Sequence, residues 1–347
     1  MRVAIIGAGW FGCHIGLSLI KKGLDVTIFE KNTDLFQGAS TFNTGRLHLG
    51  FHYPRSEKTR RQSREGYIRF TSAYPDFCEP IQNNLYLIAE KKSVLDFQTY
   101  QSILKSDQLE YQVIDPAKFG FSHMEGGLLC SEKAINPVKA AEFFGKELSK
   151  HLLLNKNITK VEAKGDHVMI DDAAFDYCVN CTYYTFNPGV LSEDVLYENI
   201  VTVLLKPTPR YSEKSFVIMD GNFFSVNPYY TTAGEYLYSL YHVKHSVVSS
   251  APTFKEAVLA GGRLHSLFYQ KQLDWKLMID EVRYYYPTFL EELTPAGSFV
   301  SIRTKLINEN ANRECIVETN SRLINVLSGK INSIFEAEDK VSEMIKR

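Results

Sequence analysis

Long apolar runs are missing from this sequence of 347 residues. No stretch of about 18 or more apolar residues occurs, which argues against a membrane span. An excess of one charge is also missing, because 39 Lys and Arg residues face 40 Asp and Glu residues, giving a formal net charge of -1. Such a balance provides no basic field for nucleic acid or anionic lipid. We therefore expect a small-molecule partner and no nucleic acid.

Cysteines are few and dispersed, with six in the chain. They do not form the framework of a disulfide scaffold, and we expect a reducing, cytoplasmic location. A strand pattern begins almost at the first residue, which leaves no room for a targeting peptide and supports the same expectation. The histidines are scattered as well, and no His, Cys and carboxylate cluster has ligand spacing, so we predict no metal site.

The first 30 residues have the pattern of a βαβ unit. An apolar run over residues 3–6 predicts a strand buried on both faces. Helical periodicity follows over residues 11–22, and residues 25–30 form a second strand. This arrangement is typical of a nucleotide-binding α/β domain.

Three glycines separate the first strand from the helix in a Gly-x-Gly-x-x-Gly pattern. Gly7 permits the tight turn, Gly9 lets the backbone approach a pyrophosphate, and Gly12 lets the helix pack closely on the strand. Glu30 ends the second strand, where a carboxylate accepts hydrogen bonds from ribose hydroxyls and disfavours a 2′-phosphate. The pattern predicts a dinucleotide site, but it does not separate FAD from NAD.

The rest of the chain alternates helical and strand patterns, with β-branched and aromatic alternation dominating residues 200–250. Outside that segment we expect helices over 57–73, 91–106, 136–150 and 253–285, and strands over 85–89, 176–182 and 322–327. A cofactor domain is predicted from residues 1–75, 135–199 and 300–347. Residues 76–134 and 200–299 would supply the substrate domain.

The segment from Gly38 to Pro54 resembles the flavin-contacting loop of the D-amino-acid oxidase superfamily. In that loop a Ser-x-x-Asn-Ser/Thr-Gly stretch leads into a His-x-Gly and a Tyr, and the similarity is closest to the L-2-hydroxyglutarate and glycerol-3-phosphate oxidoreductase branch. The strand and turn over residues 322–331 and the strand over 175–182 are also similar to this family. The resemblance implies FAD and a Rossmann-like α/β domain of the glutathione-reductase type. It also implies an inserted α+β substrate domain built on an antiparallel sheet.

The dinucleotide motif and the family resemblance together assign a set of residues to the cofactor. These residues are Gly7, Gly9, Trp10, Phe11, Gly12, Glu30, Lys31, Ser40, Asn43, Gly45, Arg46, Leu47, His48, Gly329, Lys330 and Ile331. Lys330 and the helix that follows it would stabilise negative charge on the reduced flavin.

Oxidation of an amine or alcohol by a flavin proceeds by hydride transfer to N5, and the protein orients the substrate and holds its anionic group. His48 is the first catalytic candidate, as a base, a ring-edge contact or a covalent attachment site, with Arg46 and Tyr53 beside it. Arg303 is similar to the family's substrate-carboxylate arginine, and His242 lies on a strand of the middle segment. Each has a structural alternative: backbone bonding for His48, pairing with carboxylates for Arg46, Tyr53 and Arg303, and aromatic packing on a sheet for His242.

We therefore expect an FAD-dependent oxidase or dehydrogenase acting on a CH–NH or CH–OH bond of a small polar substrate, anionic rather than neutral. Electrons would pass to oxygen or another acceptor. One alternative is an FAD-dependent tailoring enzyme acting on a sugar or a carrier-bound biosynthetic intermediate. Another is a flavin-binding protein without catalysis. The loop over residues 38–54 argues against an NAD-dependent dehydrogenase.

Overall fold

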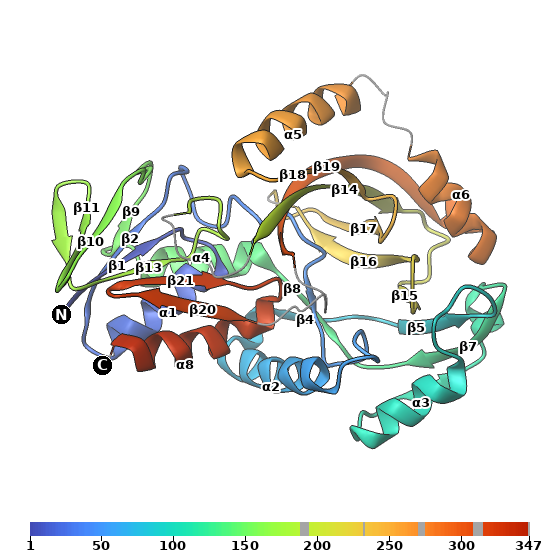
Figure 1. Ribbon diagram of the computed structural model, residues 1–347. Coiled ribbons are helices and arrows are strands. Elements are labelled where there is room, and N and C mark those ends of the chain that lie inside the picture. Colours follow the sequence, from blue (N-terminus) through green and yellow to red (C-terminus); the bar gives the residue numbers. More distant parts are fainter. Residues whose placement is uncertain (188–193, 232, 270–274, 308–314, 346–347) are drawn as a thin grey trace.

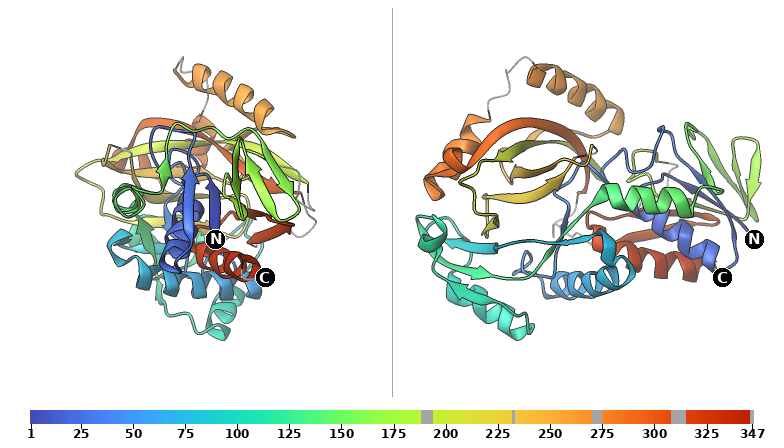
Figure 2. Two further views of the ribbon diagram at one scale, coloured as in Figure 1. Left: turned by 90° about the vertical axis from the view of Figure 1, so that its left-hand side faces the viewer. Right: turned by 180° about the vertical axis from the view of Figure 1, so that it is seen from behind.

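The computed structural model describes residues 1–187, 194–231, 233–269, 275–307 and 315–345 (Figure 1). Two sheets dominate, one at the end of the molecule that carries both termini and one at the opposite end. Figure 2 shows from two further sides that the second sheet lies beyond the first and is covered on its outer side by helices α5 (Phe254–Tyr269) and α6 (Lys276–Tyr285).

The first sheet has six strands in the order β20-β21-β13-β1-β2-β9, all parallel except β20. These strands are β1 (Arg2–Ile6), β2 (Asp25–Phe29), β9 (Leu152–Leu153), β13 (Tyr177–Asn180), β20 (Ile316–Asn320) and β21 (Leu323–Leu327). Strand β1 lies in the middle, and four of its five residues are buried, as expected for a strand covered on both faces.

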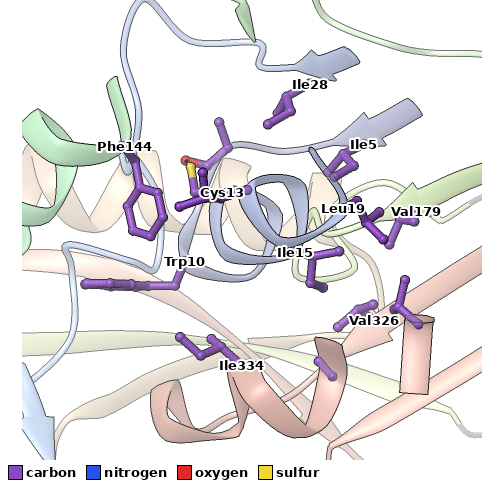
Figure 3. Close-up of a cluster of buried hydrophobic side chains, with 14 of the residues drawn as sticks. Ile5, Trp10, Cys13, Ile15, Leu19, Ile28, Phe144, Val179, Val326 and Ile334 are labelled. Carbon is purple, nitrogen blue, oxygen red and sulfur yellow. Dashed lines mark hydrogen bonds between the residues drawn. The ribbon is translucent and has the colours of Figure 1, made fainter. Parts of the chain in front are cut away.

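Helices cover one face of this sheet, and a small sheet covers the other. Val3 and Ile5 point towards α1 (Trp10–Lys21), in a core shared with α4 (Pro137–Glu147) and α8 (Ile334–Ile345) (Figure 3). Ala4 and Ile6 point to the other side and pack on the three-stranded sheet. Its strands are β10 (Val161–Lys164), β11 (His167–Ile170) and β12 (Ala173–Phe175). The alternation follows from the two-residue period of a strand.

The second sheet has nine strands in the order β18-β14-β17-β16-β15-β5-β7-β6, with β19 paired to β14. They are β5 (Asn84–Ala89), β6 (Gln112–Ile114), β7 (Met124–Leu129), β14 (Val195–Pro207), β15 (Ser215–Met219), β16 (Phe224–Tyr230), β17 (Tyr236–His242), β18 (Val247–Ala251) and β19 (Leu293–Leu306). All pairs are antiparallel except β15 with β5. One face packs on α6 and the residues after it. Part of the other face packs on α3 (Phe97–Ser106), and the rest faces the first sheet.

A second small sheet lies between the two large sheets and consists of β3 (Arg46–Leu47), β4 (Cys78–Pro80) and β8 (Lys133–Ile135). The remaining elements are α2 (Glu57–Ala73), α7 (Phe289–Glu292) and the 3-10 turns η1 (Pro75–Phe77), η2 (Pro116–Phe119) and η3 (Ile331–Ser333). Ser56 caps α2 by accepting a hydrogen bond from the Thr59 N–H, which fixes where the helix begins.

The predicted fold class is confirmed, with a Rossmann-like α/β unit and an antiparallel sheet from the middle of the chain. The exact division into domains stays a prediction, and β14 and β19 extend the second sheet into residues 195–199 and 300–306, which the sequence pattern placed in the cofactor domain. Among the described residues, no helix combines the length and apolar character needed to cross a membrane.

Candidate functional site

A cleft of about 1760 Å³ lies between the two large sheets, at the carboxyl ends of the parallel strands β1 and β2. Ligands of open α/β sheets bind at this edge. Pockets for ordinary small ligands measure about 300–1,000 Å³. The cleft is therefore large enough for a dinucleotide and a substrate together.

Fifteen of the predicted site residues line this cleft, although the sequence distributes them over three distant segments. They are Gly7, Gly9, Trp10, Phe11, Glu30, Lys31, Ser40, Asn43, Arg46, His48, Tyr53, Arg303, Gly329, Lys330 and Ile331. Gly12, Gly45, Leu47 and His242 do not line it.

The glycine loop fits a phosphate group because the backbone leaves no room for a side chain at Gly7 and Gly12, and the Ser40 hydroxyl crowds the same space at Gly9. Gly7 has φ +98°, and a Cβ there would lie 2.9 Å from the Cys181 carbonyl oxygen. A Cβ on Gly9 would lie 2.7 Å from Ser40 Oγ, and one on Gly12 would lie 1.9 Å from the Gly7 oxygen. Gly12 therefore serves the packing of helix on strand, while the other two leave the N-terminus of α1 open to the cleft.

The glycine loop, residues 7–12, and Glu30 together form the cofactor cradle. Glu30 follows β2 directly and is held in place by hydrogen bonds. Its Oε2 accepts a hydrogen bond from the Ala8 N–H at 2.8 Å, and its Oε1 accepts bonds from the backbone and side chain of Asn32 at 2.9 and 2.8 Å. The side chain is buried but borders the cleft. Because a carboxylate has about four acceptor positions, it can still receive ribose hydroxyls. Lys31 lies beside it, with Nζ 5.5 Å from the centre of the Phe254 ring.

The loop that resembles a flavin-contacting segment is folded by its own polar groups. Asn43 accepts a hydrogen bond from the Gly45 N–H at 2.6 Å and donates to the carbonyls of Ala39 and Ser40 at 2.7 and 3.0 Å. Ser40 Oγ accepts a bond from the Trp10 N–H at 3.0 Å, which ties the loop to α1. Asn43 and Gly45 thus shape the loop through these bonds.

Leu47 does not fit its predicted place at the cofactor. Leu47 is the second residue of β3, and its side chain points away from the cleft. It is fully buried in the core between the first sheet and its helices. Its neighbours in the chain, Arg46 and His48, both border the cleft. The two-residue period of the strand explains the alternation.

His48 and Arg46 share one buried carboxylate, Glu132. Arg46 Nε lies 3.0 Å from Glu132 Oε2, and His48 Nδ1 lies 3.5 Å from the same oxygen. Tyr86 donates its hydroxyl proton to this carboxylate at 2.8 Å, and its oxygen lies 3.3 Å from His48 Nδ1. Since that oxygen can then only accept a bond from the ring, Nδ1 carries the proton and Nε2 is the basic nitrogen.

Glu132 is ionised in this environment. Burial by itself would raise its pKa, but Arg46, His48 and the Leu49 N–H outweigh burial and hold the pKa well below its usual range. Arg46 is itself almost fully buried, with further bonds to Asn227 and to Asn84. Its role is thus to anchor the carboxylate, and the predicted direct action of Arg46 on a substrate does not match this position.

The Tyr53 and Lys330 side chains lie together at the same end of the cleft. Lys330 Nζ is 5.7 Å from the centre of the Tyr53 ring, and the rings of His48 and His52 stack with centroids 4.7 Å apart. The Asn332 side chain donates to the His48 carbonyl at 3.3 Å, which connects the C-terminal turn to the histidine loop. Helix α8 begins only at residue 334, after the 3-10 turn η3, so Lys330 precedes that turn.

Arg303 lies on β19 and faces the cleft, but it has a carboxylate partner of its own. Its Nε and Nη2 lie 2.9 and 2.6 Å from Glu198 Oε2, and its Nη1 donates to the Tyr241 hydroxyl at 3.1 Å. Glu198 stands directly opposite Arg303 in the register of β14 with β19. The prediction that Arg303 is ready to hold a substrate carboxylate therefore does not agree with its contacts.

His242 was predicted to be catalytic, and the structure places it outside the cleft-lining set. Its Nδ1 accepts hydrogen bonds from the Lys244 and His245 N–H groups, so the proton is on Nε2, which donates to Glu281 at 2.5 Å. His242, His245 and Glu281 place ligand atoms within 4.8 Å of one another, a cluster that their spacing in the sequence did not reveal.

Glu132 and Glu198 are the site residues that sequence reasoning missed. Neither lies in a recognisable motif, since Glu132 precedes β8 and Glu198 is inside a long strand. The pairing of β3 with β8 brings Glu132 to Arg46, and the pairing of β14 with β19 brings Glu198 to Arg303. Only strand pairing, which a single sequence does not display, could have indicated them.

Comparisons with known proteins agree with this geometry. The profile of a family described as FAD dependent oxidoreductase, DAO, matches residues 2–304. The FAD-dependent monooxygenase FPY4 of Fusarium mangiferae is 31% identical over 99% of this chain and 90% of its own length. Among solved structures, glycine oxidase from Geobacillus kaustophilus has a TM-score of 0.73 at 14% identity, covering 100% of this chain and 95% of that one. L-alpha-glycerophosphate oxidase from Mycoplasma pneumoniae, a structure with FAD bound, has a TM-score of 0.71 at 13% identity, covering 100% and 94%.

Proposed function

Because the chain belongs to the DAO family of FAD-dependent oxidoreductases, we propose that it oxidises a CH–OH or CH–NH bond of a small polar substrate, with His48 as the base. The observation that carries the proposal is the contact of His48, which lines the cleft, with the buried, ionised Glu132 behind it. The type of substrate is itself proposed, since the solved structures share only their fold with this chain.

The residues of the cleft fit FAD along its whole length. Gly7 and Gly9 would receive the pyrophosphate, Glu30 the ribose, and the turn at Gly329 and Lys330 the pyrimidine side of the ring. When bound, FAD supplies an acceptor for the hydride that leaves the substrate carbon. A positive charge at Lys330 favours the anionic reduced ring.

The protein's own part in the reaction is to hold the substrate and remove a proton from its hydroxyl or amine. The hydrogen bonds around Glu132 assign the proton of His48 to Nδ1, so Nε2 is the atom that accepts the substrate proton. The imidazolium that forms is then stabilised by Glu132, 3.5 Å from Nδ1. A positioned base of this kind contributes about 10²–10⁴-fold to a rate.

The test begins with the purified protein. We expect a flavin absorbance spectrum, and anaerobic reduction of that flavin by at least one member of a panel of amino acids, hydroxy acids, amino sugars and polyols. His48→Asn should slow this reduction about 10²-fold or more while FAD stays bound. His123→Asn, at a half-exposed histidine outside the cleft, is the matched control. Unchanged reduction in the His48 variant would refute the role of this residue.

A second candidate is a monooxygenase, because the Fusarium relative carries that name and aligns over 99% of this chain. Such an enzyme places one atom of O₂ in the product and reduces the other to water with two electrons from a reduced nicotinamide. Reaction under ¹⁸O₂ distinguishes the two functions, since the proposed oxidation leaves no label in the product. Stoichiometric use of NADH or NADPH together with ¹⁸O in the product would favour the monooxygenase.

A further inference from the structure

Each arginine that lines the cleft in the described part of the chain has a carboxylate partner. Arg46 Nε lies 3.0 Å from Glu132, and Arg303 Nη2 lies 2.6 Å from Glu198. The third, Arg55, is mostly exposed and has its Nε 2.8 Å from Asp220 Oδ2, an ion pair without the alignment of a hydrogen bond. The three guanidinium groups at the cleft are thus paired with carboxylates in place, and the other cations that line the cleft among the described residues are Lys31, Lys156, Lys305 and Lys330.

The Arg303 pair has the greatest consequence for substrate binding, because it lies on the wall opposite the cofactor cradle. All three guanidinium nitrogens are in contact with Glu198 or Tyr241. Lys305 approaches the other Glu198 oxygen to 3.6 Å. The Glu198 side chain is only 7% exposed, so water screens its charge weakly. A carboxylate arriving at Arg303 would have to displace Glu198, which Arg303 and Lys305 both hold in place.

Among largely apolar side chains, that wall also carries five neutral groups that both donate and accept hydrogen bonds. Thr202 on β14, Ser225 and Asn227 on β16, Tyr241 on β17 and Ser301 on β19 all line the cleft. They come from neighbouring strands of one sheet. Hydroxyls and amides on a sheet surface match a ligand with several hydroxyl groups better than one with a net charge.

We propose that the substrate is uncharged and carries several hydroxyl groups, and that Glu198 is the specificity-determining residue that keeps carboxylates away from Arg303. This rests on the proposed function and replaces the expectation of an anionic substrate. Specificity here comes from a repulsive element, since Glu198 disfavours the carboxylate by its charge. Of the lysines, Lys330 belongs to the cofactor end of the cleft, and Lys305 is paired with Glu198.

The experiment uses the FAD-loaded enzyme and pairs of probes that differ only in one terminal group. These pairs are glycerol with glycerate, xylitol with xylonate, and D-glucose with D-gluconate. Binding is measured by perturbation of the flavin absorbance spectrum, without turnover. We expect at least one neutral member to bind the wild-type enzyme about tenfold or more tightly than its carboxylate counterpart.

Glu198→Gln keeps the shape and removes the charge. We expect it to tighten binding of the carboxylate members about tenfold or more, and adding Arg303→Met should abolish that gain. Glu291→Gln is the matched control, because it breaks an exposed glutamate–arginine pair with Arg210 outside the cleft.

Two results would overturn the inference. One is a wild-type enzyme that binds every carboxylate member as tightly as its neutral partner, or binds no neutral member at all. The other is a Glu198→Gln enzyme with unchanged preference. Either can occur while FAD binds and is reduced normally, so the failure of this inference is distinct from the failure of the proposed oxidation.

Discussion

Replacing Glu132 by Gln tests the centre of the proposed site, because it keeps the shape of the side chain and removes its charge. In the wild-type protein Glu132 lies 3.5 Å from His48 Nδ1 and 3.0 Å from Arg46 Nε, and its side chain is fully buried. Two unit charges about 4 Å apart interact by about 4 kcal/mol at an effective dielectric constant of about 20. That value is an upper limit, because the His48 side chain is 20% exposed.

The expected shift follows from reciprocity. His48 helps to lower the pKa of Glu132, so the anion in turn favours the protonated form of His48. An opposite charge at such a distance shifts a pKa by about 1–3 units. In Glu132→Gln we therefore expect the acidic limb of the rate–pH profile to move towards lower pH. The rate on the alkaline plateau should fall about 10²-fold, because the base is weaker and no longer oriented.

The assay is anaerobic stopped-flow reduction of the bound FAD, across pH, by the best reductant of the substrate panel. Histidine side-chain ¹⁵N NMR gives a second readout that needs no substrate. It should show the proton of His48 on Nδ1 in the wild-type protein and a mixture of tautomers in Glu132→Gln. Loss of the charge also leaves Arg46 buried without its partner, at a cost of about 3–5 kcal/mol in unfolding free energy, so thermal stability is measured in parallel.

A matched variant separates catalysis from stability. Glu338 lies 3.0 Å from His14 Nε2 and has a lowered pKa, because it accepts a hydrogen bond from that histidine, but neither residue lines the cleft. Glu338→Gln should destabilise the protein without moving the rate–pH profile. The reasoning is refuted if Glu132→Gln keeps FAD, the wild-type profile and the Nδ1 tautomer, or if Glu338→Gln shifts the profile equally.

Three further predictions concern the cofactor cradle, the pH dependence of stability and the flavin. Gly9→Ala should weaken FAD binding about tenfold or more in a fluorescence titration, because the new Cβ would lie 2.7 Å from Ser40 Oγ. An FAD affinity equal to that of the wild-type protein would contradict the role of Gly9 in cofactor binding. Burial lowers the pKa of His14, and the hydrogen bond from His14 lowers the pKa of Glu338. As the pH falls, both groups therefore bind protons at a higher pH in the unfolded chain than in the folded protein. The melting temperature should therefore be highest above about pH 6.5 and fall steadily towards pH 3, by about 2–4 °C for each kcal/mol lost; a flat calorimetric profile would argue against both shifts. Lys330→Met should lower the flavin midpoint potential by about 30 mV or more, equivalent to about 1.4 kcal/mol for a two-electron couple. An unchanged potential would show that the charge of Lys330 does not act on the flavin ring.

The sequence indicated the cofactor end of the molecule well, because the relevant signals are local. Gly7, Gly9 and Glu30 belong to one short βαβ unit, in which a backbone turn and a strand end fix their positions without help from distant residues. Helix α2 was predicted over its observed range for the same reason, since its helical period lies within 17 consecutive residues, 57–73. Family resemblance then identified the 38–54 loop and Lys330, both of which border the cleft.

What the sequence determined by itself is therefore the nucleotide fold and, through family resemblance, the cofactor. The tertiary structure alone decided the charge state of the site. Strand pairing placed Glu132 beside Arg46 and Glu198 beside Arg303, across 86 and 105 positions of the chain. Electrostatic interactions depend on distance in space, and a single sequence carries no register between distant strands. For that reason an arginine that the sequence suggested as a carboxylate receptor proved to be already paired, and this pairing is the basis for proposing a neutral substrate.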